Sequence, residues 1–249
     1  MNKLPEITLA FWIMKICATT LGETAGDLFS MTLNLGYAVS TMILISLFLV
    51  ALISQLMSKK FHPLLYWTVI LSTSTAGTTM SDYMDRTLGL GYAKGSLLLF
   101  AILMAVLAYW RYVVGSLSVD NIRTRKVEIL YWSAILFSNT LGTALGDFLV
   151  DDSGLGFGLV AVIIALLLGL IAIAKHYTKI SHVLLFWLAF VLTRPFGATL
   201  GDFLTKTKEK GGLNLGTINS SLILSLILAA VMAGTYLRKK PQSSSQFTI

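Results

Sequence analysis

Charged residues are scarce in this chain. Lysine, arginine, aspartate and glutamate make up 12% of its 249 residues, whereas hydrophobic residues make up 55%. Soluble domains carry about 25% charged residues, so this composition excludes a water-soluble globular protein. Cys17 is the only cysteine, which excludes a disulfide framework or a cysteine metal cluster within one chain. No nucleotide-binding motif is present, and we expect neither direct use of ATP nor enzyme activity.

What the chain does contain is one short pattern in four copies. Each copy has a tryptophan, a glycine ten residues later, and a Gly-Asp or Ser-Asp pair that begins four residues after that glycine. The copies are Trp12…Gly22…Gly26-Asp27, Trp67…Gly77…Ser81-Asp82, Trp132…Gly142…Gly146-Asp147 and Trp187…Gly197…Gly201-Asp202. Equal spacing without gaps indicates internal repeats, each of which is one structural unit.

Each repeat holds two apolar runs long enough to cross a bilayer, which takes about 20 residues. The sequence therefore predicts an all-α polytopic membrane protein with eight transmembrane helices. The predicted helices are 8–30, 37–57, 64–84, 93–114, 128–149, 156–175, 181–204 and 217–237. A tight turn joins the two helices of each repeat. Its second residue is always Asn or Gly, the types that tolerate a left-handed backbone: Asn34, Gly89, Gly154 and Asn214.

The chain is predicted to form a single transmembrane domain, 1–249, that ends in a disordered Ser/Gln-rich tail at 241–249. The predicted repeats are 8–60, 64–126, 128–180 and 181–240. Since every repeat begins on the same side, we expect parallel repeats around an axis along the membrane normal. The four first helices would surround this axis, and the nearly all-apolar second helices would face lipid.

Basic residues set the expected orientation. Twelve lie at the termini or between repeats, and only five lie in the turns within repeats. Because cytoplasmic loops are enriched in Lys and Arg, we expect both termini in the cytoplasm. We therefore attribute the net charge of +7 to basic loops on the cytoplasmic side, and no nucleic-acid partner is expected. The expected partners are the lipid bilayer, a metal cation and protons, and a homo-oligomer is allowed.

Polar side chains recur at every fourth position of the first helices. Residues four apart lie on one helix face, and we call this set the polar stripe. Its members are Lys15, Thr19, Glu23 and Asp27 in the first repeat, Ser74, Thr78 and Asp82 in the second, Asn139, Thr143 and Asp147 in the third, and Arg194 and Asp202 in the fourth. If the four repeat tryptophans are interfacial anchors, each Asp lies about 22 Å further along its helix, at 1.5 Å per residue.

The polar stripe carries five carboxylates and two cationic side chains. Several ionised carboxylates packed together need a cation or protons to neutralise them. We therefore expect the stripes to meet in one water-accessible chamber, with Lys15 and Arg194 tuning the carboxylate pKa values or serving as counter-ions. Oxygen ligands alone favour hard ions such as Mg²⁺, Mn²⁺ or Ca²⁺. The predicted metal ligands are Glu23, Asp27, Asp82, Asp147 and Asp202, with neutral oxygens from Thr19, Thr78, Asn139 and Thr143.

Other interpretations of these residues stay open. The four Asp could cap helix ends by accepting hydrogen bonds from turn amides, and the Gly-xxx-Gly/Ser pairs are typical of close helix packing. The chain could be a channel or transporter for a proton, Na⁺ or an organic amine. It could also be an intramembrane enzyme that uses the paired carboxylates of Glu23 and Asp27, or a scaffold that transports nothing. None of these needs a resident cofactor.

The four two-helix units with Trp and Gly-Asp resemble a family of bacterial inner-membrane proteins known as a four-fold repeat of unknown function. The resemblance covers residues 8–237 and implies an eight-helix fold in the bacterial inner membrane. A link of the family to metal tolerance favours a secondary transporter that exports a hard divalent cation, Mn²⁺ first, in exchange for protons. Ser81, Glu23 and Arg194-Pro195 break the four-fold pattern, which argues against a simple symmetric pore.

Overall fold

The computed structural model of the protein describes residues 4–119, 122, 124–152 and 154–237. Regular structure in these residues is helical throughout, as predicted. The α-helices are α1 (Leu9–Asp27), α2 (Gly36–Met57), α3 (Pro63–Asp82), α4 (Tyr92–Val114), α5 (Arg125–Asp151), α6 (Gly156–Tyr177), α7 (His182–Thr205) and α8 (Thr217–Leu237). The predicted tail 241–249, and the basic residues Lys3, Arg123, Arg238, Lys239 and Lys240 of the orientation argument, lie outside the described residues.

Local sequence explains where the helices begin and turn. The Thr8 hydroxyl accepts a hydrogen bond from the Phe11 amide at the start of α1, at 3.4 Å, which is an ordinary N-cap. The turns within repeats adopt the expected left-handed conformation at their second residue. Its φ is 55° at Asn34, 71° at Gly89, 67° at Gly154 and 58° at Asn214. The choice of Asn or Gly at this position is therefore a requirement of the turn.

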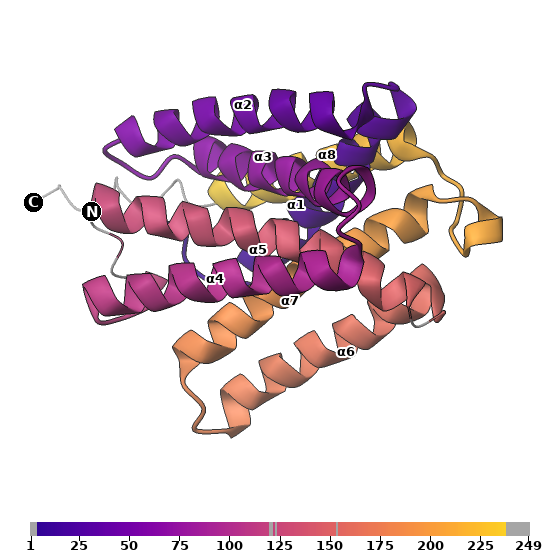
Figure 1. The fold of residues 1–249 in the computed structure, drawn as a ribbon. Coiled ribbons are helices and arrows are strands. Elements are labelled where there is room, and N and C mark those ends of the chain that lie inside the picture. Colours follow the sequence, from indigo (N-terminus) through magenta and orange to yellow (C-terminus); the bar gives the residue numbers. More distant parts are fainter. Residues whose placement is uncertain (1–3, 120–121, 123, 153, 238–249) are drawn as a thin grey trace, which may run out of the picture.

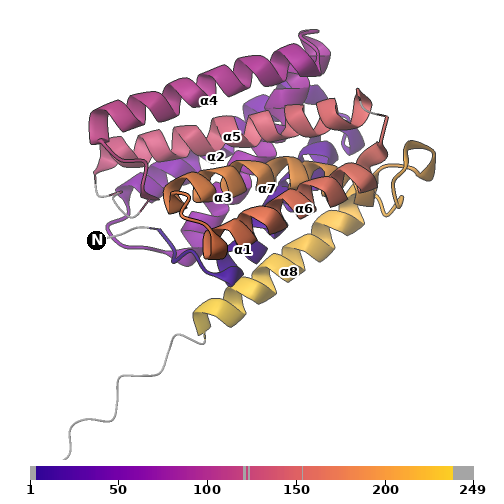
Figure 2. The same ribbon diagram turned by 90° about the horizontal axis from the view of Figure 1, so that it is seen from below.

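Four helices form a closed ring, and we call α1, α3, α5 and α7 the inner helices. Helix α1 contacts α3 and α7, and α5 contacts the same two helices from the other side. The remaining helices lie on the periphery (Figures 1 and 2): α2 packs on α3, α4 on α5, α6 on α7, and α8 on α1. Each outer helix therefore packs on the inner helix of the next repeat, and the last one closes the ring on the first.

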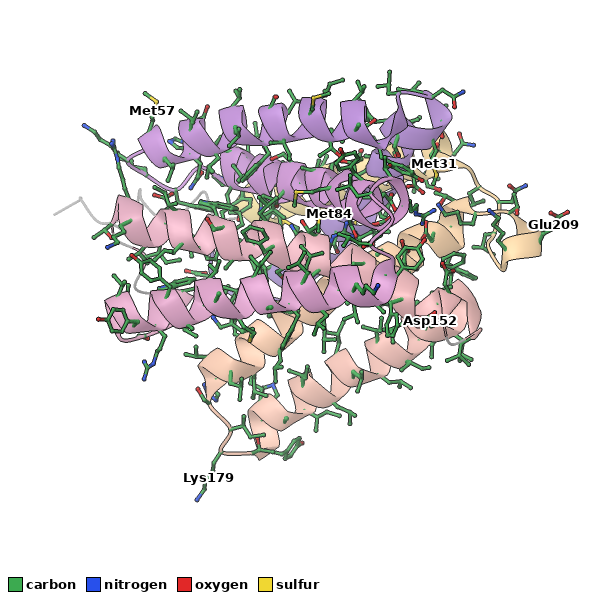
Figure 3. All side chains as sticks on the ribbon, in the orientation of Figure 1. Met31, Met57, Met84, Asp152, Lys179 and Glu209 are labelled. Carbon is green, nitrogen blue, oxygen red and sulfur yellow. The ribbon has the colours of Figure 1, made fainter. Side chains whose placement is uncertain are left out.

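The two ends of the ring differ in what they carry. Figure 3 shows Met57 and Lys179, next to the links between repeats, at one end of the molecule. Asp152 and Glu209, from turns within repeats, lie at the opposite end. We call the first the Trp end, because the repeat tryptophans lie near the start of the inner helices, and the second the turn end. The repeat Asp residues lie towards the turn end of the inner helices.

Six helices in the described part of the chain are long and apolar enough to cross a membrane, namely α2, α4, α5, α6, α7 and α8. They indicate a multi-pass membrane protein. Helices α1 and α3 fall outside this set because their polar side chains lower the hydropathy. Only 17% of the α2 span is buried inside the protein, against 67% of the α5 span. The outer helices thus present apolar side chains outward, as expected for lipid contact.

Three of the four repeat tryptophans do not face outward as interfacial anchors, so this expectation was wrong for those three. Trp67, Trp132 and Trp187 are buried, and only Trp12 is partly exposed. They pack with neighbouring aromatic rings across the Trp end. Ring centroids are 5.6 Å apart for Phe11 and Trp67 and 5.7 Å apart for Trp110 and Trp187. Aromatic packing of this kind fills the Trp end of the ring.

Close packing of the inner helices depends on the glycines of the repeat motif. A Cβ added at Gly22 would lie 2.3 Å from the Ser74 Cβ and 3.0 Å from its backbone carbonyl carbon. Equivalent glycines touch the next inner helix in the same way, Gly77 against Asn139 and Gly197 against Thr19. Each helix therefore presents its motif glycines to its neighbour around the ring. The small-residue interpretation of the Gly-xxx-Gly pairs is confirmed.

We expect Gly22→Ala to destabilise the fold by about 1–3 kcal/mol, because the added methyl must push α1 and α3 apart. The matched control is Gly169→Ala on outer helix α6, where an added Cβ meets nothing within 4 Å. That control should be neutral or stabilising by up to about 1 kcal/mol, since alanine favours helix. Thermal unfolding of the detergent-solubilised variants measures both, and equal stabilities for the two would contradict the packing argument.

Candidate functional site

The centre of the ring is occupied by a buried ion pair between α1 and α7. The Arg194 Nη1 lies 3.0 Å from the Glu23 Oε2, and the exposed fractions of the two side chains are 0% and 4%. The same carboxylate oxygen accepts hydrogen bonds from the hydroxyls of Thr78, at 3.1 Å, and Thr143, at 3.3 Å. All four inner helices therefore contribute one residue to this contact.

The second guanidinium nitrogen of Arg194 holds the same group together from the other side. Its Nη2 donates to the hydroxyls of Thr78 and Thr143, at 2.5 and 2.7 Å, and to the Ser74 carbonyl, at 3.2 Å. Burial of a charge is costly unless the charge is paired and hydrogen-bonded. Arg194 is paired with Glu23 and hydrogen-bonded through both Nη atoms, whereas its Nε has no hydrogen-bond partner among the described residues. The middle of the ring is thus a closed polar plug, which we call the central cluster.

A second polar layer lies nearer the Trp end. The Lys15 ammonium is fully buried, 3.5 Å from the Asn139 side-chain oxygen and 3.9 Å from the centroid of the Phe190 ring. Asn139 in turn donates to the Thr73 hydroxyl at 2.9 Å, and Thr19 donates to the Thr193 carbonyl at 3.2 Å. Within the described residues, no carboxylate forms a salt bridge with Lys15. Its partners there are an amide and an aromatic face.

The four repeat Asp residues form two pairs, each bridged by one cationic side chain. Lys206 Nζ lies 2.5 Å from Asp27 Oδ2 and 3.1 Å from Asp202 Oδ1. All four Asp side chains are buried, whereas 18% of the Lys206 side chain is exposed. We call Asp27, Asp202 and Lys206 the lysine bridge.

The other Asp pair has the same arrangement around an arginine. The Arg86 guanidinium contacts Asp82 Oδ1 through Nε at 2.8 Å and Asp147 Oδ2 through Nη2 at 3.1 Å. The exposed fraction of the Arg86 side chain is 34%. We call these three residues the arginine bridge. In each bridge the cation follows one of its two Asp partners by a single helical turn and reaches the other on the neighbouring inner helix.

Lys206 lies just beyond the end of α7, and the two Asp carboxylates beside it stabilise its positive charge. Burial alone would lower the pKa of Lys206, but the charges of Asp202 and Asp27 outweigh burial and raise it well above the usual lysine value. Lys206 therefore stays protonated throughout the physiological pH range. A permanent cation between two buried carboxylates neutralises most of their repulsion.

Comparison with known proteins places these features in a family. The family model of the Repeat of Unknown Function, DUF347, matches the chain four times, at residues 10–61, 65–115, 130–181 and 185–241. The chain belongs to this family. The four matches correspond to the four repeats predicted from the sequence. Comparison with the curated proteins and with the solved structures gives no match.

The four DUF347 repeats bring the predicted site residues together in layers. Glu23, Thr78 and Thr143 join Arg194 in the central cluster, with the counter-ion role expected for Arg194. The four Asp lie in the lysine and arginine bridges, and Thr19 and Asn139 lie in the layer of Lys15. Within the described part of the chain, no group of three or more His, Cys, Asp or Glu residues is placed to hold a metal ion.

The single shared chamber expected from the sequence is not what the structure shows. The polar stripe fills the ring with buried side chains, and the five carboxylates are divided among three ion-paired groups. Two cavities formed by the described residues, of about 660 and 240 Å³, are lined by no carboxylate of the stripe. Neutralisation by built-in cations explains the difference, because paired charges can be packed without water.

The capping interpretation of the four Asp also loses its support. None of the hydrogen bonds found among the described residues runs from a turn amide to these carboxylates. Their partners include Arg86 and Lys206. The sequence analysis missed these two residues as part of the site and counted them only as turn charges. One more step of four along the polar stripe, beyond Asp82 and Asp202, reaches both of them.

We expect Glu23→Gln and Arg194→Met each to destabilise the protein by about 3–5 kcal/mol, because each leaves the other charge buried without a partner. The double variant should lose clearly less stability than the sum of the losses of the two single variants, since no lone charge remains in it. Chemical unfolding in detergent measures the three free energies. The control is Asp152→Asn, which changes an exposed acid at the turn end. Strictly additive losses of stability in the double variant would contradict the pairing of Glu23 with Arg194.

Proposed function

We propose that the protein is a secondary transporter of a hard divalent cation, with Mn²⁺ favoured, that exchanges the ion for protons in the outward direction. The observation that carries the proposal is the pair of bridges at the turn end. In each bridge two buried carboxylates from neighbouring inner helices share one partly exposed cation. A transported cation would bind between the two carboxylates of a bridge, in place of the side-chain cation.

Lys206 is a built-in substitute for that cation. Its ammonium is small and lies between oxygens of Asp27 and Asp202, where a hard metal ion would find the carboxylate ligands it prefers. The side chain is long and partly exposed, so it can leave the pair without unfolding a helix. A metal ion would then take over the neutralising role, and protons would do so when the ion leaves.

The central cluster is the closed barrier of this transporter. Glu23 and Arg194 block the axis of the ring with residues from every inner helix, which favours a carrier over an open channel. Separation of this pair would expose Glu23, Thr78 and Thr143 as a second set of oxygen ligands. The ion would then pass towards the layer of Thr19 and Asn139 at the Trp end. The metal ligands proposed are thus those of the sequence analysis, used in succession.

We further propose that all eight helices cross the membrane. Helices α1 and α3 have their polar faces covered inside the ring, so their lower hydropathy does not prevent insertion. The excess of basic residues between repeats supports an orientation with the Trp end and both termini in the cytoplasm. With the family resemblance, this supports placement in the bacterial inner membrane, with parallel repeats around the membrane normal.

When a proton gradient is imposed across the membrane, reconstituted protein should move Mn²⁺ in the direction opposite to the proton flow, and an internal pH dye should report the accompanying proton movement. We expect Asp202→Asn to reduce the flux at least about tenfold, because the lysine bridge loses one carboxylate and with it a ligand charge. Asp152→Asn, in which an exposed acid at the same end is neutralised, should retain wild-type flux.

Parallel assays with Mg²⁺, Ca²⁺, Zn²⁺ and Na⁺ gradients determine the ion. Flux of Na⁺ or protons alone would favour the transporter of another cation considered above. No flux of any tested ion, with correctly folded protein, would contradict transport by this chain.

We expect Lys206→Gln to respond to Mn²⁺ more strongly than the wild type. Without the tethered cation, Asp27 and Asp202 repel each other, and the metal ion becomes their only strong partner. Mn²⁺ at 100 times its Kd for the variant would add about 2.7 kcal/mol of stability, seen as a thermal shift larger than that of the wild type and of Lys208→Gln. Lys208 is an exposed lysine of the same turn. An identical shift in all three proteins would rule out Lys206 as the substitute for the ion.

A further inference from the structure

The larger cavity lies outside the polar stripe, at the Trp end. It has a volume of about 660 Å³ and lies between α1, α6 and α7, and Leu117, Ser118 and Val119 of the α4–α5 link also line it. Its apolar wall includes Trp12 and Ile16 of α1, Leu168 and Ile171 of α6, and Phe186 of α7. We call this cavity the lateral pocket. None of its lining residues belongs to the ion pairs described above, so the proposed transport does not account for it.

The polar lining of the lateral pocket is concentrated at its rim. Lys175 and His176 come from the last turn of α6, and His182 is the first residue of α7. All three are exposed, as is Lys179 in the intervening loop, which Figure 3 shows projecting from this end of the molecule. Glu6 is the one acidic residue in the lining. Basic side chains and imidazole N–H groups thus outnumber acidic groups where the helices leave the membrane.

The shape of the lateral pocket matches an amphiphile. Its lining on α7 runs from His182 at the rim to Thr193, a depth of about 16 Å at 1.5 Å per residue. The rim is basic and the deeper wall is apolar. A phosphate group would find hydrogen-bond donors at the rim, and an acyl chain would cover the apolar wall. Basic pockets between transmembrane helices bind anionic lipid headgroups in this way.

We propose that the lateral pocket is a binding site for an anionic phospholipid, with its phosphate at Lys175, His176 and His182 and one acyl chain along Ile16, Leu168 and Phe186. The proposal depends on membrane placement and is independent of any transported ion. A bound lipid also completes the protein surface here, because it covers apolar wall that the outer helices leave open. A lipid bound in the lateral pocket contacts both α6 and α1 and so links two helices of different repeats.

Native mass spectrometry of the full-length protein in a neutral detergent tests the site. Phosphatidylglycerol should bind at least about fivefold more tightly than phosphatidylcholine with the same acyl chains, the effect of about one basic contact. The triple variant Lys175→Gln/His176→Gln/His182→Gln should lose this preference. The control Lys59→Gln/Lys60→Gln, at exposed lysines of the α2–α3 link outside the pocket lining, should keep it.

A second variant tests the apolar wall separately. Ala172→Trp adds bulk at an exposed position of the lining, so it should weaken binding of both lipids without unfolding the protein. Equal affinity of the wild type for the two lipids, or an unchanged preference in the triple variant, would overturn the proposal. Complete competition by glycerol 1-phosphate, which has no acyl chain, would also overturn it and point to a soluble phosphate ligand.

Discussion

The ion pair between Glu23 and Arg194 is the interaction on which the rest of this structure depends. Both charges are buried at the centre of the ring, and each needs the other there because an unpaired buried charge costs several kcal/mol. Their hydrogen-bond partners Thr78 and Thr143 come from the two remaining inner helices. The pair therefore fixes all four inner helices at one depth, and the motif glycines allow the backbones to approach closely enough for these contacts.

The backbone follows a four-fold pattern, whereas the charges of the two bridges follow a two-fold one. Repeats two and four supply the bridging cations Arg86 and Lys206, and the equivalent positions of repeats one and three are Met31 and Asp151. Each cation serves an Asp of its own repeat and one of a neighbouring repeat. The repeats are therefore joined by ion pairs as well as by helix packing. Each outer helix makes the same kind of link by packing on the next repeat.

Exposure of the charged groups rises from the centre of the ring to the turn end. The exposed fraction is 0% for the Arg194 side chain, 18% for Lys206 and 34% for Arg86. Exchange of a bridging cation for an external one would therefore begin at the turn end, where water reaches the bridges. The central cluster would change last.

The sequence by itself determined the eight helices, the left-handed turn residues and the four repeats, because hydrophobic length, glycine conformation and repeated spacing are local properties. It also placed the polar stripe on one face of each first helix. Only the tertiary structure decided that Arg86 and Lys206 would each reach an Asp of another repeat, that Glu23 would pair with Arg194, and that the tryptophans would pack inward. Those contacts join residues far apart in the chain, and their partners depend on how the ring closes, which no spacing within one helix records.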